Sequence, residues 1–158
     1  MLETLIKVVQ IFKKEKIEYC LIGGLAMLLH NGRANTVDMD FYILVNDLKK
    51  ISDLFLKLGY ETRSAGDYQI KTKIDNVPID LLYADHYVGA DVVHRAVEKK
   101  LGNIFIRIAT PEDLIVLKSI ADRSIDKRDI EELRELFGKK LDEDYIEKKL
   151  RYVKKLLS

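Results

Sequence analysis

Two aspartates inside an apolar, strand-like run are the feature that most constrains how this chain folds. The run Val37–Val45 is rich in β-branched and aromatic residues, which predicts a β-strand. Side chains alternate along a strand, so Asp38 and Asp40 project from the same face with their Cα atoms about 7 Å apart. Two like charges this close repel each other unless a cation lies between them, and a hard divalent metal is the simplest such cation. Taken alone, the pair fits two surface acids on a half-buried strand better, so the neighbouring segments decide.

A glycine turn precedes the two aspartates. Residues 19–22 predict a short buried strand, Gly23-Gly24 follow directly, and residues 24–30 predict one or two helical turns. A helix that begins at such a turn offers free backbone N–H groups to an anion, and glycine lets a phosphate approach the backbone. An ordinary strand-to-helix turn is the alternative, because a Gly-Gly pair alone is weak support for a phosphate site.

A third acidic residue lies in another strand-like run. Asp80 stands between Ile79 and Leu81 in the segment Val77–Tyr83, and therefore faces either water or a site. Three strand-borne aspartates and a phosphate-cradling turn are typical of two-metal phosphoryl or nucleotidyl transfer. One metal lowers the pKa of the attacking hydroxyl, and the other holds the triphosphate and stabilises the leaving pyrophosphate.

These segments together resemble the nucleotidyltransferases of the polymerase β superfamily. The resemblance rests on Gly23-Gly24, on residues 33–40 and on Asp80, and it covers residues 17 to 137. The segments 110–118 and 123–130 make it more specific, since they are similar to the small prokaryotic branch related to AbiEii-type toxins. The resemblance implies that Asp38, Asp40 and Asp80 are catalytic metal ligands, with Mg²⁺ or Mn²⁺ as cofactor and an NTP as substrate.

Two basic residues in the last third of the chain are further candidates for nucleotide binding. Lys118 follows Leu114 by one helical turn in a helix that begins at Thr110. It either reaches the triphosphate, as the resemblance implies, or covers apolar surface with its stem. Arg123 either supports the site together with Asp126 or is a solvated loop residue. In the second case, Asp126 is simply the N-cap of a helix over residues 127–137.

The loop that leads into the Asp38 strand holds two more candidate nucleotide-binding residues. Arg33 and Thr36 contact phosphate or brace this loop, and the sequence favours neither interpretation. A basic final helix, residues 142–157, could guide an RNA acceptor, although a solvated face is the more common explanation for such a helix.

The order of predicted elements gives the fold class. Beyond the segments above, we expect helices over 2–15, 47–58 and 89–100, paired strands over 68–74 and 77–83, and a final strand over 103–109. This order predicts an α/β (α+β) nucleotidyltransferase-like fold. Its sheet is mixed and mostly antiparallel with helices on one face, and a C-terminal helical lobe follows. We expect one domain, residues 1–158, with the sheet in about 1–109 and the lobe in about 110–158.

Composition fits a compact cytoplasmic enzyme. The chain is 47% hydrophobic and 34% charged, which argues against disorder. The net charge of +1 gives no global attraction to nucleic acid. The single cysteine, Cys20, cannot form an internal disulfide, and no apolar stretch is long enough to cross a membrane.

The sequence therefore predicts a metal-dependent transfer of NMP from an NTP to a hydroxyl or phosphate acceptor. The acceptor is RNA, protein or a small molecule, and the sequence does not choose among them. One alternative is a toxin that uses the same chemistry and has an antitoxin partner. The other is a non-catalytic nucleotide-binding or protein-binding module.

Overall fold

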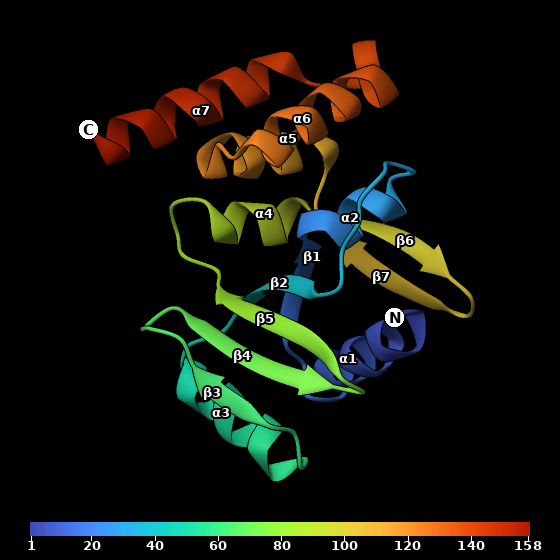
Figure 1. Ribbon diagram of the computed structural model, residues 1–158. Coiled ribbons are helices and arrows are strands. Elements are labelled where there is room, and N and C mark those ends of the chain that lie inside the picture. The colour runs from blue at the N-terminus through green and yellow to red at the C-terminus, as the bar shows by residue number, and fades with distance from the viewer.

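A seven-stranded mixed sheet organises the protein, as a computed structural model that describes residues 1–158 shows (Figure 1). The strands follow the order β3-β4-β5-β2-β1-β7-β6. Only β1 with β7 and β2 with β5 pair in parallel, so the predicted mixed, mostly antiparallel sheet is confirmed. The strands are β1 Glu18–Ile22, β2 Met39–Leu44, β3 Thr62–Ser64, β4 Gln69–Ile74, β5 Val77–Tyr83, β6 Val97–Leu101 and β7 Ile104–Ile108.

Helices cover both faces of this sheet. The helices are α1 Leu2–Lys14, α2 Gly23–Leu29, α3 Leu48–Lys57, α4 Gly89–Arg95, α5 Pro111–Ala121, α6 Ser124–Phe137 and α7 Glu143–Leu157, with a short 3₁₀ turn at Gly138–Lys140. Phe12 of α1 packs edge-on against Phe41 of β2, whereas Gly89 of α4 packs against the ring of the next strand residue, Tyr42. Adjacent strand residues face opposite sides. The expectation of helices on one face is therefore wrong.

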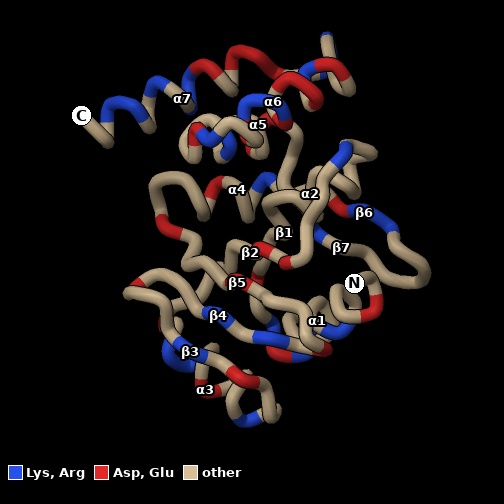
Figure 2. Tube along the Cα trace, viewed as in Figure 1, with Lys and Arg blue, Asp and Glu red and all other residues tan.

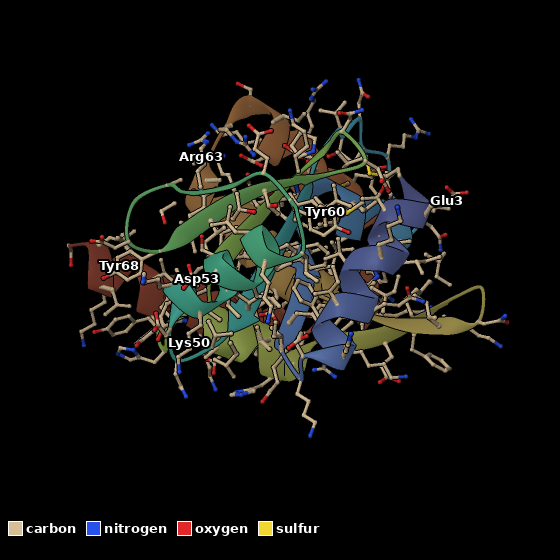
Figure 3. The ribbon with its side chains drawn as sticks, turned by 90° about the horizontal axis from the view of Figure 1, so that it is seen from below. Glu3, Lys50, Asp53, Tyr60, Arg63 and Tyr68 are labelled. Carbon is tan, nitrogen blue, oxygen red and sulfur yellow. The ribbon has the colours of Figure 1, made fainter.

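The two helical layers differ in content. Seen from below, α1 and α3 lie in front of the sheet (Figure 3). The opposite layer holds α4, with α5, α6 and α7 stacked beyond it (Figure 1). Thirty-two buried hydrophobic residues form one continuous core cluster that runs from Leu5 to Ile146. None of the helices combines the length and the apolar character needed to cross a membrane.

The segment 89–100 departs from the prediction of one helix. The helix ends at Arg95, and Val97–Leu101 forms strand β6, which pairs antiparallel with β7. Gly102 closes the hairpin with a φ of +60°, a backbone conformation that glycine adopts without strain. The helix propensity of the Glu-Lys-Lys-Leu stretch is a weak preference, and the ladder to β7 overrides it. The short strand β3 was not predicted either.

Local hydrogen bonds and backbone angles explain where several of the predicted helices and strands begin or end. Asp47 caps α3 by accepting from the N–H of Lys49, and Thr110 caps α5 by accepting from the N–H of Asp113. Asp75 and Asn76 both have positive φ, as a two-residue hairpin turn between β4 and β5 requires. These turns and caps set the direction in which the chain enters the elements around the site.

Candidate active site

The glycine turn lies directly against one of the predicted carboxylates. Gly23 has a φ of +72°, and a Cβ at this position would lie 2.5 Å from Oδ2 of Asp40. A Cβ on Gly24 would lie 3.1 Å from Cβ of Thr36. A larger residue at either position would therefore displace the carboxylate or its loop. The turn is glycine-rich because acidic and hydroxyl side chains approach its backbone closely.

The sheet register places two of the three aspartates side by side. β2 and β5 pair in parallel, with Asp40 directly opposite Asp80. Acidic positions on these neighbouring strands are visible near the middle of the molecule (Figure 2). Side chains of directly paired residues point to the same face. The carboxylates of Asp40 and Asp80 therefore share one face of the sheet, although the residues are far apart in sequence.

Asp38 lies in the turn before the strand rather than in it. The strand begins at Met39, and Val37 is 73% exposed, so the predicted strand over 37–45 is two residues too long at its start. Thr36 explains this boundary, because its hydroxyl donates to the carboxylate of Asp38 at 3.0 Å and to the carbonyl of Asp38 at 3.1 Å. These local hydrogen bonds take the place of a strand ladder at this position. Thr36 thus orients Asp38.

The third carboxylate has a basic partner. Lys71 of β4 lies opposite Asp80 in the sheet register and donates to its carboxylate at 3.1 Å. The structure contains no group of three His, Cys, Asp or Glu side chains close enough to hold a metal ion. The three aspartates face one cavity, but their side chains do not converge on a single point.

Asp40 lies in the most unfavourable electrostatic environment of the three. The pKa of Asp40 is raised to about 7, mainly by burial and in addition by the charges of Asp38 and Asp80. Lys71 and Arg123 act in the opposite direction and only partly offset this. A buried carboxylate beside two others is the environment that a bound cation would relieve.

Lys118 reaches the same region from α5. Its side chain is 9% exposed, and its Nζ lies 2.7 Å from Oδ2 of Asp129 and 3.9 Å from Oδ1 of Asp126. The ammonium group is thus buried in an ion pair rather than extended into water. The interpretation of Lys118 as a lysine that only covers apolar surface is therefore wrong.

Arg123 and Asp126 form a tight local pair at the start of α6. Oδ2 of Asp126 accepts hydrogen bonds from the backbone N–H of Arg123 at 3.1 Å and from its Nε at 2.7 Å. These hydrogen bonds hold the pKa of Asp126 below its usual value. The helix begins at Ser124 with Arg123 as its N-cap, so Asp126 lies in the first turn and is not the N-cap of a helix over 127–137.

One cavity of about 900 Å³ brings the predicted residues together. Its lining includes all nine of them: Gly23, Gly24, Arg33, Thr36, Asp38, Asp40, Asp80, Lys118 and Arg123. Only two of its 15 lining residues are hydrophobic. The sheet side of the cavity contributes carboxylates, and the helical side contributes both cationic and acidic groups.

Three charged lining residues on α6 were not predicted. Arg128, Asp129 and Glu132 line the same cavity. Glu132 accepts from the backbone N–H of Arg33 at 2.9 Å and so ties the loop before Asp38 to α6. The i, i+4 spacing of Arg128 and Glu132 was a visible signal that both side chains share a helix face.

Comparison with known proteins identifies the family of this chain. A family model described as a nucleotidyl transferase of unknown function matches residues 1–156. The chain therefore belongs to this nucleotidyltransferase family. A search of curated protein sequences gives no match.

Solved structures share the fold at low sequence identity. The antibiotic-resistance factor ANT(2'')-Ia, solved with adenylyl-2''-tobramycin, has a TM-score of 0.68 and 15% identity, with 98% of each chain covered. The lincosamide antibiotic adenylyltransferase LnuA, with lincomycin bound, has a TM-score of 0.64 and 16% identity, covering 85% of this chain and 96% of LnuA. A nucleotidyltransferase-like protein from Paracoccidioides brasiliensis has a TM-score of 0.58 and 18% identity, covering 96% and 86% of the two chains. These likenesses establish a nucleotidyltransferase fold.

Proposed function

We propose that this protein transfers NMP from an NTP to an acceptor hydroxyl in a reaction that depends on Mg²⁺ or Mn²⁺. The observation that carries the proposal is the register of Asp40 beside Asp80, next to the Gly23 turn and in one cavity with Lys118 and Arg123. Carboxylates paired with cations across a cavity match the needs of a metal-bound triphosphate. Membership in a nucleotidyltransferase family supports the same conclusion.

The residues present fit a hard divalent cation. Asp38, Asp40 and Asp80 offer only oxygen donors, which Mg²⁺ prefers. Burial, together with the charges of Asp38 and Asp80, raises the pKa of Asp40, and a bound cation would relieve this environment. Asp38 and Asp40 would hold the metal, and Asp80 would complete its ligand set after leaving Lys71. When bound, the metal polarises the α-phosphate and lowers the pKa of the attacking hydroxyl.

The remaining residues would position the nucleotide and move one proton. Gly23 and Gly24 would face the phosphates, with Lys118 and Arg123 beside the leaving group. The acceptor oxygen forms a bond to the α-phosphorus as the bond from that phosphorus to the bridging oxygen breaks. Pyrophosphate leaves with the electron pair, and Asp80 takes the hydroxyl proton.

The test is transfer of label from α-³²P-ATP to total RNA, to a protein extract and to small hydroxylated compounds. ATP is the first nucleotide to use because ANT(2'')-Ia and LnuA are tied to adenylyl transfer. Asp40→Asn and Asp80→Asn should each lower transfer at least about a hundredfold. Asp53→Asn, on the exposed side of α3, is the matched control and should leave transfer unchanged. Full transfer by Asp40→Asn would contradict the proposal. A toxin role with an antitoxin partner stays a prediction from the sequence resemblance.

A further inference from the structure

The cavity of about 900 Å³ that holds Asp38, Asp40 and Asp80 is called the carboxylate cavity from here on. A second cavity of about 690 Å³ adjoins it. The two share Gly23, Asp40, Lys118 and Arg123. Their chemistry differs, because 12 of the 18 residues around the second cavity are hydrophobic, against 2 of 15 around the first. A molecule in the second cavity would place one end against Asp40 and the rest of its body against apolar side chains.

The apolar walls of this second cavity come mainly from the sheet and from helices α5 and α7 of the C-terminal lobe. Tyr42 and Leu82 line it from β2 and β5, Leu114 and Leu117 from α5, and Val153 from α7. Leu114 and Val153 are only 1% and 7% exposed, so these parts of the wall are packed into the protein. Part of the wall of the second cavity therefore belongs to the packed interior of the protein.

Buried polar contacts fix the wall that α7 contributes. Asp113 of α5 is buried and accepts hydrogen bonds from Nε of Arg95 at 3.2 Å and from the hydroxyl of Tyr145. The guanidinium of Arg95 also lies 3.6 Å from the centre of the Tyr145 ring. A second ion pair joins Lys149 of α7 to Asp91 of α4. These contacts hold α7 over α4 and α5.

The rim of the second cavity is apolar and exposed. Its lining includes Tyr87, Ile120, Leu156 and Leu157, which are 46%, 40%, 46% and 77% exposed. The C-terminal end of α7 and the segment between β5 and α4 lie on the same side of the molecule (Figure 1). Exposed apolar groups gathered around one opening mark a binding site more often than chance.

We propose that the second cavity is the acceptor subsite, and that the acceptor is a small molecule with a hydroxyl group on a largely apolar body. This inference rests on the proposed nucleotidyl transfer, whose NTP would occupy the carboxylate cavity. The hydroxyl lies at the shared border near Asp40, and the apolar body lies between Tyr42, Leu117 and α7. The reaction joins the acceptor oxygen to the α-phosphorus and releases pyrophosphate.

Size and charge favour a small molecule over RNA. Pockets for small ligands have volumes of about 300–1,000 Å³ and mostly apolar linings. The second cavity has both of these properties. Its lining holds two basic residues, Lys118 and Arg123, and both are already paired with acids. Binding of a nucleic acid strand instead needs an open groove of free cations that follows the backbone.

The experiment compares acceptors and variants. Wild-type protein with Mg²⁺ and α-³²P-ATP is offered hydroxylated compounds in size-matched pairs, one apolar-bodied alcohol and one polyol per pair, alongside total RNA. We expect label on apolar-bodied alcohols. Leu156→Asp and Leu157→Asp should reduce that transfer about tenfold or more, equivalent to the loss of about 1.4 kcal/mol of binding. Leu58→Asp, at the C-cap residue of α3 and 46% exposed like Leu156, should not change it.

A second measurement does not depend on the acceptor. Anilinonaphthalene sulfonate, a dye that binds apolar cavities, should bind the wild type and Leu58→Asp alike and Leu156→Asp about tenfold more weakly. Unchanged dye binding in Leu156→Asp would overturn the apolar subsite. Label on RNA alone, or a dimer that Leu156→Asp converts to a monomer, would overturn the small-molecule acceptor. Failure of the proposed function is recognised separately, by absence of Mg²⁺-dependent ATP binding in calorimetry.

Discussion

Asp40 is a carboxylate kept in an environment that disfavours its charge. Its pKa is raised from an ordinary 3.8 to about 7, first by burial and then by Asp38 and Asp80. An acid whose pKa is raised by folding contributes stability at pH values below its unfolded pKa. This contribution is lost as the pH rises through its folded pKa. The stability that Asp40 removes from the metal-free protein is therefore largest above about pH 7.

Asp40→Asn should therefore raise the melting temperature of the protein in EDTA, and by more at about pH 8.5 than at about pH 5. Relief of even about 1 kcal/mol corresponds to about 2–4 °C for a chain of this size. Thermal melting of both proteins at the two pH values measures the effect. A large drop in melting temperature at the higher pH would identify Asp40 as a structural residue.

Lys118 is predicted to have both a structural and a catalytic effect, and the two can be separated. Lys118→Ala leaves Asp129 without its partner and should destabilise the fold by about 1–3 kcal/mol, while turnover falls about a hundredfold. The double variant Lys118→Met with Asp129→Asn removes both charges and should recover most of the stability but not the turnover. Lys148→Ala, on α7, is the control. Recovery of turnover in the double variant would show that Lys118 acts only on structure.

The sequence predicted the three aspartates of the carboxylate cavity better than the ion-pair partners of the charged residues around it. Asp38, Asp40 and Asp80 became candidates through their strand-like flanks, the preceding glycine turn and the family resemblance, all of which are visible along the chain. The partner of Lys118 could not be found this way, because Asp129 meets it only through the packing of α5 against α6. Lys71 was missed for a similar reason, since its contact with Asp80 depends on the β4–β5 register.

At the level of elements, α7 forms one wall of the second cavity, and its position depends on a few polar contacts. Tyr145→Phe removes the hydrogen bond from the Tyr145 hydroxyl to buried Asp113 and leaves the Arg95–Asp113 pair in place. We expect a loss of about 1 kcal/mol, or about 2–4 °C in melting temperature.

The matched control is Tyr152→Phe on the same helix, where the ring is 41% exposed. It should melt like the wild type. If the proposed acceptor subsite is correct, Tyr145→Phe should also weaken dye binding while ATP binding stays unchanged. An equal effect of both tyrosine substitutions would argue against a positioning role for the Tyr145 hydroxyl.

The hairpin β6–β7 shows where element prediction failed and what signal was present. Residues 97–101 are mostly charged and favour a helix locally, so they continued the predicted helix from residue 89. A Gly-Asn dipeptide at 102–103 separates two short runs that begin or end in branched apolar residues, which is a hairpin signal. The caps at Asp47 and Thr110 were predictable because each depends on a hydrogen bond within three residues.

On the scale of the whole molecule, the sheet order assembles the site from distant parts of the chain. β5, β2 and β1 are neighbours in the sheet, so Asp80, Asp40 and the Gly23 turn meet although they span more than 50 residues of sequence. The C-terminal lobe then lines the opposite side of both cavities with Lys118 and Arg123, and that of the second cavity with Leu156 as well. A nucleotide in the carboxylate cavity would bridge the sheet and the helical lobe, and binding should stabilise the molecule as a unit.

ATP with Mg²⁺ should therefore raise the melting temperature of the entire protein in a single transition. A ligand at 100 times its Kd adds about 2.7 kcal/mol of stability, which corresponds to about 5–10 °C for a chain of this length. EDTA should abolish this shift, because the carboxylates then repel the triphosphate instead of sharing a metal with it. Asp38→Asn should lose most of the shift, whereas Leu156→Asp, at the apolar rim, should keep it. Equal shifts with Mg²⁺ and with EDTA would contradict a metal-bridged triphosphate between the sheet and the helical lobe.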